Sequence, residues 1–341
     1  MKGRIEWIDI AKGFAIIFVV VGHVVKSYHN VHLYENSTLF NFSTQFVYSF
    51  HMALFMMLSG MLLGTKKMPA KLCGGGYFRK ILAYGVPYVF FSFVWWLFKI
   101  IFSGHVNSTL TVADILWIPL YPISFMWFVY ALLIMVLIQL RVGTERSTLF
   151  KNIHLMIAFL LLFIQPFLVK TLDCISYKDL VISDFMRMYV YFLIGVYGSH
   201  FITSLMMGRH RGNLILLSGM VLFAGNILLY NGMDFMHLLP IKFVLALSGC
   251  VFFIGLSVYI AKSDVLAYVG RNSLSVYVLQ GLSIAVTRQG MAAVLGKELN
   301  EWVALAVCTV MGVLIPLVIY WVSTKVWKCD FVFTPLKYIR L

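Results

Sequence analysis

The chain has 341 residues, of which 61% are apolar and only 12% are charged, and its formal net charge is +14. Soluble domains contain about a quarter charged residues, so this composition excludes an ordinary soluble enzyme and indicates a membrane protein. The cations are spread over short segments without a long basic tract, which argues against a nucleic-acid-binding protein and fits loops that face anionic membrane lipids.

Ten apolar segments follow one another along the chain, each long enough to cross a hydrocarbon core about 30 Å thick. They are predicted near residues 8–28, 41–63, 81–102, 120–140, 153–169, 185–206, 213–230, 239–260, 272–294 and 302–323. The segments leave no room for a soluble catalytic domain. The sequence therefore predicts one all-α integral-membrane domain over residues 1–341, with about ten transmembrane helices around a central cavity.

The first apolar segment contains two ionisable residues, Lys12 and His23, eleven positions apart. On an α-helix this spacing brings the two side chains within about 20° of one face, with a rise of about 16 Å. Ionisable groups inside a span cost about 3 kcal/mol or more and persist mainly where they line a polar cavity, so the pair is interpreted as two ends of one pathway. The alternatives are an interhelical hydrogen bond for His23, and for Lys12 an interfacial position or a pairing with Asp9.

The same segment follows a basic N-terminus, as in a secretory signal peptide. No small-residue cleavage site follows Val25, so we expect a retained first helix. In the second segment, His51 is expected near the middle of the membrane, where it orients His23 or binds an acceptor; a structural hydrogen bond is the alternative. The pair Ser59 and Gly60 is more typical of close helix packing than of catalysis.

The longer connection at 103–119 contains His105, Asp114 and Trp117. Non-helical backbone at membrane depth is tolerated only when it is buried in protein or wet, so this connection is expected to re-enter the membrane or to cap a cavity. The five cysteines show neither metal-ligand spacing nor an obvious pairing, and are expected to be packing residues: Cys73, Cys174, Cys250, Cys308 and Cys329. No metal site is predicted.

The lysines and arginines are unevenly divided between the two sets of loops. If both termini are cytoplasmic, 18 of them fall in the inside segments and 8 in the outside segments. Cytoplasmic loops are enriched in lysine and arginine, so this bias supports an even number of spans. The sequence thus predicts a multi-pass protein of the inner (plasma) membrane with both termini in the cytoplasm.

Short motifs distributed over the whole chain carry a family resemblance. They are residues 4–13, 19–23, 50–60, 78–82 with Pro87 and Tyr88, 126–129 and 272–280. Together they resemble the acyltransferase 3 family of integral-membrane acyltransferases, and most closely its branch related to fucose O-acetylases. The most specific feature is the family's pattern of Arg or Lys, ten residues, then His, which is present as Lys12 and His23. Relatives often have His where this chain has Gln280, so the resemblance does not extend to a proton carrier there.

The resemblance implies transfer of an acyl group, usually acetyl, from cytoplasmic acyl-CoA to a hydroxyl of a surface polysaccharide or lipid-linked glycan. In that reaction Lys12 is expected to hold CoA phosphate, helped by Arg79 and Lys80 at the cytoplasmic mouth. His23 is expected to act as general base on the acceptor hydroxyl or briefly as acyl carrier. Imidazole suits either role because its unperturbed pKa lies near neutrality.

The resemblance also suggests residues of the pocket. Trp127 and Phe128 are expected in a wall of the acyl or sugar pocket, with belt or core aromatics as the alternative. Tyr277 and Gln280 share a helix face and are expected to hydrogen-bond a sugar hydroxyl, with interhelical bonding as the alternative. Asp9 is included as a pocket residue.

A different class of function is also consistent with ten spans and intramembrane charges. The alternative is a polytopic transporter or a flippase of a lipid-linked glycan. Against it stand the lack of a sequence repeat and of paired Gly/Pro-broken helices, which are typical of inverted-repeat transporters. Release of CoA in the presence of a sugar acceptor would favour the enzyme, and flux without covalent change would favour the transporter.

Overall fold

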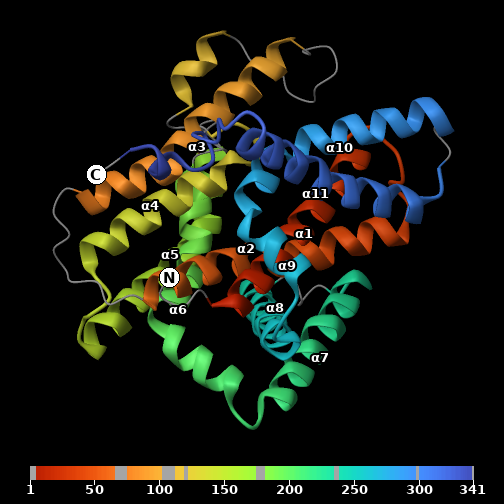
Figure 1. Cartoon of the computed structure of the whole chain (residues 1–341). Coiled ribbons are helices and arrows are strands. Elements are labelled where there is room, and N and C mark those ends of the chain that lie inside the picture. The colour runs from red at the N-terminus through yellow and green to blue at the C-terminus, as the bar shows by residue number, and fades with distance from the viewer. Residues whose placement is uncertain are drawn as a thin grey trace. The chain divides into compact units, whose positions relative to one another are not determined.

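The computed structural model describes residues 5–65, 75–101, 112–118, 122–173, 181–233, 238–296 and 299–339. Within these ranges the chain forms helices and no β-strand (Figure 1). The α-helices are α1 (Glu6–His29), α2 (Thr38–Gly64), α3 (Gly75–Ile101), α4 (Trp127–Val142), α5 (Thr148–Asp173), α6 (Val181–Met207), α7 (Arg211–Tyr230), α8 (Leu239–Ile260), α9 (Asp264–Arg271), α10 (Ser273–Leu295) and α11 (Glu301–Lys325). Short 3₁₀ helices lie at η2 (Val112–Trp117), η3 (Ser124–Met126) and η5 (Pro335–Lys337).

Ten helices among the described residues are long and apolar enough to cross a membrane. They coincide with the ten segments predicted from the sequence, so the prediction of an all-α, multi-pass membrane protein is confirmed. The short helix α9 is an addition that the sequence reading did not separate from the following span. Of the connection at 103–119, only residues 112–118 are described, and they contain η2; His105 lies outside the described residues.

The chain divides into two compact units, and each is described by itself. The first unit comprises Met1–Leu58 and His200–Lys328, and the second comprises Ser59–Ser199 and Cys329–Leu341. The first therefore contains α1, most of α2, and α7 to α11. The second contains the last turns of α2, α3 to α5, most of α6 and the C-terminal segment. The central cavity and the single domain remain predictions.

An aromatic cluster joins three helices of the first unit. The ring of Phe18 on α1 lies 5.2 Å from that of Phe50 on α2 and 4.8 Å from that of Phe253 on α8. The rings of Phe50 and Phe253 stack on each other at 4.9 Å. Aromatic side chains bury large apolar areas and prefer such edge-to-face and offset arrangements. The cluster fixes α1 and α2, the helices that carry His23 and His51.

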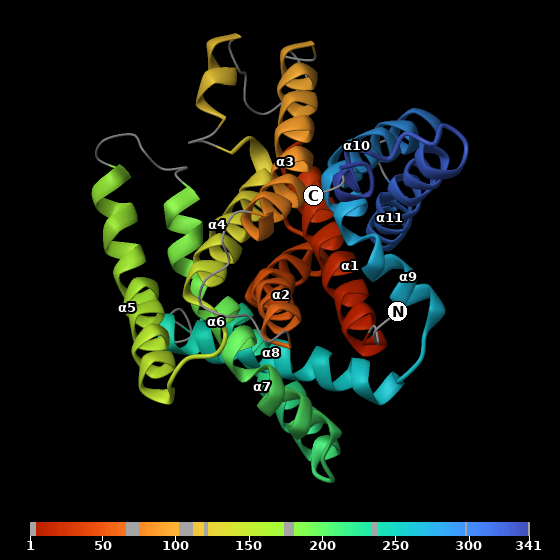
Figure 2. The same ribbon diagram turned by 60° about the vertical axis from the view of Figure 1, so that its left-hand side comes forward.

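The helices α10 and α11 pack side by side in the first unit, and both contact α1 (Figures 1 and 2). One close approach to α1 is at Gly312 on α11. A Cβ added there would lie 2.7 Å from Val20 on α1 and 3.2 Å from Ile284 on α10. Small residues let membrane helices approach closely, so Gly312 places Val20 and Ile284 at one height in the bundle.

Two contacts organise the second unit. The end of α2 packs on α6 through Gly60, where an added Cβ would collide with the backbone of Phe192; this is the close helix packing expected for Ser59 and Gly60. On α5, His154 hydrogen-bonds to two α6 hydroxyl groups, with 2.7 Å from Nδ1 to Tyr197 and 2.8 Å from Nε2 to Tyr189. Both ring nitrogens of His154 are thereby hydrogen-bonded between two helices that are long and apolar enough to cross a membrane.

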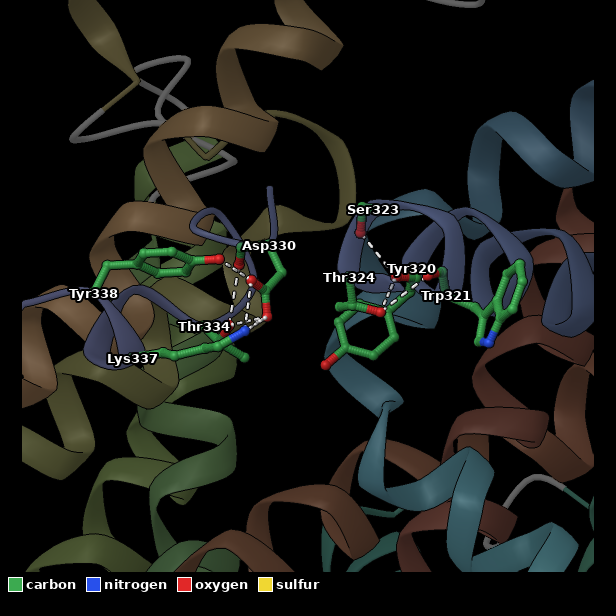
Figure 3. A network of polar contacts seen from close by, with 8 residues as sticks. All are labelled: Tyr320, Trp321, Ser323, Thr324, Asp330, Thr334, Lys337 and Tyr338. Atoms are coloured by element: carbon green, nitrogen blue, oxygen red, sulfur yellow. Dashed lines mark hydrogen bonds and ion pairs between the residues drawn. The ribbon is translucent and has the colours of Figure 1, made fainter. Parts of the chain in front are cut away.

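The C-terminal segment folds around one carboxylate, Asp330 (Figure 3). Asp330 is buried and accepts hydrogen bonds from the hydroxyl of Thr334 at 2.9 Å, from Lys337 Nζ at 3.2 Å and from the hydroxyl of Tyr338. Burial alone would raise the pKa of Asp330, but these three donors together hold its pKa below the ordinary value. The ionised form of Asp330 therefore stabilises the folded segment.

Replacing Asp330 by asparagine is expected to loosen the C-terminal segment at neutral pH. The variant loses the charged hydrogen bonds of Asp330, of which the bond to the exposed Lys337 contributes little. We expect the free energy of opening the segment to fall by about 1 kcal/mol, which corresponds to roughly five-fold faster amide hydrogen exchange in residues 329–338. Because the folded pKa is depressed, this stabilisation is present above about pH 4 and is lost as the pH falls through the folded pKa. Mass-spectrometric exchange should show the difference at neutral pH and its disappearance in acid. The exposed Glu145, replaced by glutamine, serves as control; equal exchange in both variants would contradict the expectation.

Candidate active site

The backbone of α1 around Lys12 is held by a close crossing with α9. A Cβ at Gly270 of α9 would collide with the carbonyl oxygen of Asp9, and a Cβ at Gly13 would collide with that of Leu266. Ser263 precedes α9 as its N-cap, and its side chain accepts a hydrogen bond from the amide of Leu266. The crossing places α9 directly beside the turn of α1 that carries Lys12.

Lys12 and Asp9 lie on this turn with different exposures. The side chain of Asp9 is buried and that of Lys12 is half-buried. The helix α1 continues without interruption from Glu6 to His29, so the eleven-residue spacing between Lys12 and His23 is a true helical spacing. The rise between the two residues is therefore about 16 Å along one rigid helix.

His23 and His51 come together between α1 and α2. The two residues are near enough to interact electrostatically. His51 is only 4% exposed, and its Nδ1 donates a hydrogen bond of 2.6 Å to the carbonyl oxygen of Val47. In the neutral ring this bond fixes the tautomer, and Nε2 then carries the lone pair. The ring of Tyr48 packs edge-on against His51 at 5.0 Å, and Gly22 beside His23 lets Tyr48 approach α1.

The two candidates on α10 are deeply buried in the first unit. Tyr277 is 4% exposed, and Gln280 is completely buried. The helix α10 follows α9 after Asn272 alone, so the motif that contains Tyr277 and Gln280 starts next to the crossing at Gly270. Because α10 contacts α1, the structure brings the helix of the last motif against the helix of the first.

The remaining candidates belong to the second unit. Arg79 is exposed and Lys80 is half-buried in the first turns of α3, where Lys80 Nζ lies 5.8 Å from the ring centroid of Tyr84. Trp127 and Phe128 open α4, with Phe128 buried and their rings 6.1 Å apart. Their assignments to donor binding and to a pocket wall remain predictions.

Three features were missed by the sequence reading. Tyr48 packs against His51, α9 supports the turn of Lys12, and the guanidinium of Arg187 lies 5.8 Å from the ring centroid of Trp127. A signal for α9 was present, because Ser263 is a good N-cap before an eight-residue amphipathic stretch. Arg187 also forms an ion pair with Asp184 at 2.7 Å, so the same guanidinium contacts both a carboxylate and the ring of Trp127.

Comparison with protein families connects the chain to an activity. Residues 5–321 match the acyltransferase 3 family, described as an acyltransferase domain. The chain belongs to the acyltransferase 3 family. No curated protein and no solved structure matches it. This acyltransferase is thus an enzyme embedded in a membrane by ten helices among its described residues, and the comparison gives no support to the transporter alternative.

Over the part of the chain that the structure describes, no group of three His, Cys, Asp or Glu side chains is placed to hold a metal ion. Cys250 and Cys308 are buried free thiols, as expected for packing residues, whereas Cys329 is exposed. Cys73 and Cys174 lie outside the described residues.

Proposed function

We propose that this acyltransferase transfers an acyl group, most simply acetyl, from cytoplasmic acyl-CoA to a hydroxyl of a surface polysaccharide or lipid-linked glycan. The proposal is supported by the position of His23 on α1, an unbroken helix that also bears Lys12 about 16 Å away, and by the nearness of His51 on α2 to His23. A phosphate-binding cation and a catalytic base at this separation fit a donor whose phosphates and thioester lie at opposite ends of a long arm.

The proposed orientation follows from the distribution of lysine and arginine. With both termini in the cytoplasm of an inner (plasma) membrane, Lys12 lies near the inner face and His23 lies in the outer half of the first span. The donor then anchors at Lys12, with Arg79 and Lys80 assisting, and its thioester reaches His23. A lysine binds phosphate as a point charge, so Lys12 suits this role.

The proposed chemistry is general-base catalysis by His23. Its imidazole takes the proton of the acceptor hydroxyl as the oxygen attacks the thioester carbonyl. The carbon–sulfur bond breaks, and the proton passes from the imidazolium to the leaving thiolate, which gives the ester and free CoA. His51, fixed by its hydrogen bond to Val47, orients His23 or the acceptor. No metal is needed for this sequence of steps.

The direct test is turnover by the purified protein in lipid vesicles. With acetyl-CoA labelled in the acetyl group and a glycan acceptor, we expect free CoA to appear and label to enter the glycan as a base-labile ester. Movement of the glycan across the vesicle membrane without CoA release would contradict the proposal. The identity of the acceptor is varied in the same assay, from neutral to acidic oligosaccharides and lipid-linked sugars.

Lys12→Ala is expected to weaken acetyl-CoA binding about tenfold, because one charged contact to phosphate is lost. The KM for the glycan should stay unchanged, and Lys12→Arg should retain most of the affinity. A phosphate-free pantetheine thioester, which has no group for Lys12 to hold, should bind both proteins equally. Calorimetric titration measures these affinities, and an unchanged acetyl-CoA affinity in Lys12→Ala would remove the anchoring role.

A further inference from the structure

Gln280 is the most unusual polar residue of the first unit. Its side chain is 0% exposed, and neither its Oε1 nor its Nε2 has a hydrogen-bond partner among the described residues. Leaving a buried amide unpaired is costly, because the group has given up its hydrogen bonds to water without replacing them. Buried polar groups in folded proteins are otherwise paired, so an amide with two orphaned atoms indicates a position reserved for a ligand.

Other buried polar side chains show that the fold pairs such groups where it can. On α10 itself, the hydroxyls of Ser275 and Ser283 each donate to a backbone carbonyl three or four residues earlier in the chain, at 2.7 and 3.1 Å. The equally buried Gln139 in the second unit donates from Nε2 to the carbonyl of Gly143 at 2.7 Å. Gln280 differs from the buried amides of Gln139 and Asn226, in which only the oxygen lacks a partner, because neither the oxygen nor the nitrogen of its amide is paired.

The height of Gln280 in the bundle follows from two contacts of the first unit. Gly270, just before α10, touches α1 at Asp9 and Gly13, and Ile284 on α10 meets Val20 of α1 across Gly312. The helices α1 and α10 therefore run in the same direction. Gln280 precedes Ile284 by four residues on the same face, which is about 6 Å nearer the N-terminal end of α1.

This height falls between the two ends of the proposed donor path. Gln280 therefore lies at about the height of Ile16, which is one turn before Val20 on α1. It is then about 6 Å beyond Lys12 and about 10 Å short of His23 along the helix axis. A glycan hydroxyl held at Gln280 would be too far from His23 to react, whereas the middle of an arm that stretches from Lys12 to His23 would pass beside it.

We propose that Gln280 binds an amide group of the pantetheine arm of acyl-CoA, an inference that rests on the proposed function. The arm carries secondary amides between its phosphate and thioester ends, and each offers one N–H and one C=O. The Gln280 amide complements both at once, because Nε2 donates to the carbonyl and Oε1 accepts from the N–H. Gln280 is thus assigned to the donor, in place of the sugar contact predicted from the helix face that it shares with Tyr277.

The test compares Gln280→Leu with Gln139→Leu, two substitutions of identical shape and burial. An apolar replacement of an unpaired buried amide should leave thermal stability equal or higher, whereas loss of the bond to Gly143 should lower it. Acetyl-CoA affinity should fall about tenfold in Gln280→Leu and remain unchanged in Gln139→Leu. Thermal unfolding in detergent and calorimetric titration measure the two quantities on the full-length protein.

A donor without amides separates arm binding from other effects. A simple alkyl thioacetate should be used equally well by the wild type and by Gln280→Leu. If Gln280→Leu bound acetyl-CoA as the wild type does, or lost as much stability as Gln139→Leu, the inference would be overturned while the proposed function stood. If the wild type itself bound no acetyl-CoA, the proposed function would fall, and this inference with it.

Discussion

Replacing His23 by alanine is expected to reduce acyl transfer by at least 10²- to 10⁴-fold, the usual contribution of a positioned general base, while the protein stays folded. The proposed mechanism predicts this loss because His23 is the base, and the nearby His51, whose orientation is fixed by the bond to Val47, cannot take its place. The measurement is CoA release from acetyl-CoA with a glycan acceptor, together with thermal unfolding of each variant. His154 is the matched control, because both of its ring nitrogens bond to tyrosine hydroxyls.

The control should separate a catalytic histidine from a structural one. His154→Ala is expected to lower the unfolding temperature and to keep substantial turnover, the opposite of His23→Ala. Added imidazole should restore part of the activity of His23→Ala if His23 acts as a base. Retained turnover in a well-folded His23→Ala protein would exclude the catalytic role, and the pairing with His51 would then be interpreted as an interhelical contact.

The fold was largely predictable because membrane crossing depends on properties local in the sequence. A span needs length and apolarity, and both are visible in a window of about twenty residues. The helix α9 was not predicted as a separate element because it has only eight residues and joins α10 through Asn272. The crossing at Gly13 and Gly270 was not predicted either, since the closeness of two glycines on different helices depends on tertiary packing.

The candidate site was predictable to the extent that one helix defines it. The relation between Lys12 and His23 follows from helical geometry alone, and α1 is continuous over both. The approach of His51 to His23 and the unpaired burial of Gln280 depend on which helices are neighbours, which spacing within a single segment does not encode. The contact of Arg187 with Trp127 joins α6 to α4 and was hidden for the same reason.

Gly270→Ala is expected to disrupt the support of the Lys12 turn. A Cβ at this position would overlap the carbonyl oxygen of Asp9 and would lie 2.7 Å from the amide nitrogen of Gly13, so α9 must move away from α1. Both contacts are backbone atoms that cannot rotate aside, and overpacking of this kind costs about 1–3 kcal/mol or more. Thermal unfolding should occur at a lower temperature, and acetyl-CoA affinity should fall because the helix turn that carries Lys12 shifts.

Gly290→Ala is the matched control, because an added Cβ on this α10 glycine meets no atom within 4 Å. Alanine favours the helix over glycine by about 0.5–1 kcal/mol, so this variant should be as stable as the wild type or more stable, with unchanged affinity. Equal stability of the two alanine variants would show that α1 and α9 are not in tight contact. Loss of stability in Gly270→Ala with full acetyl-CoA affinity would instead show that the crossing supports the fold without positioning Lys12 for the donor.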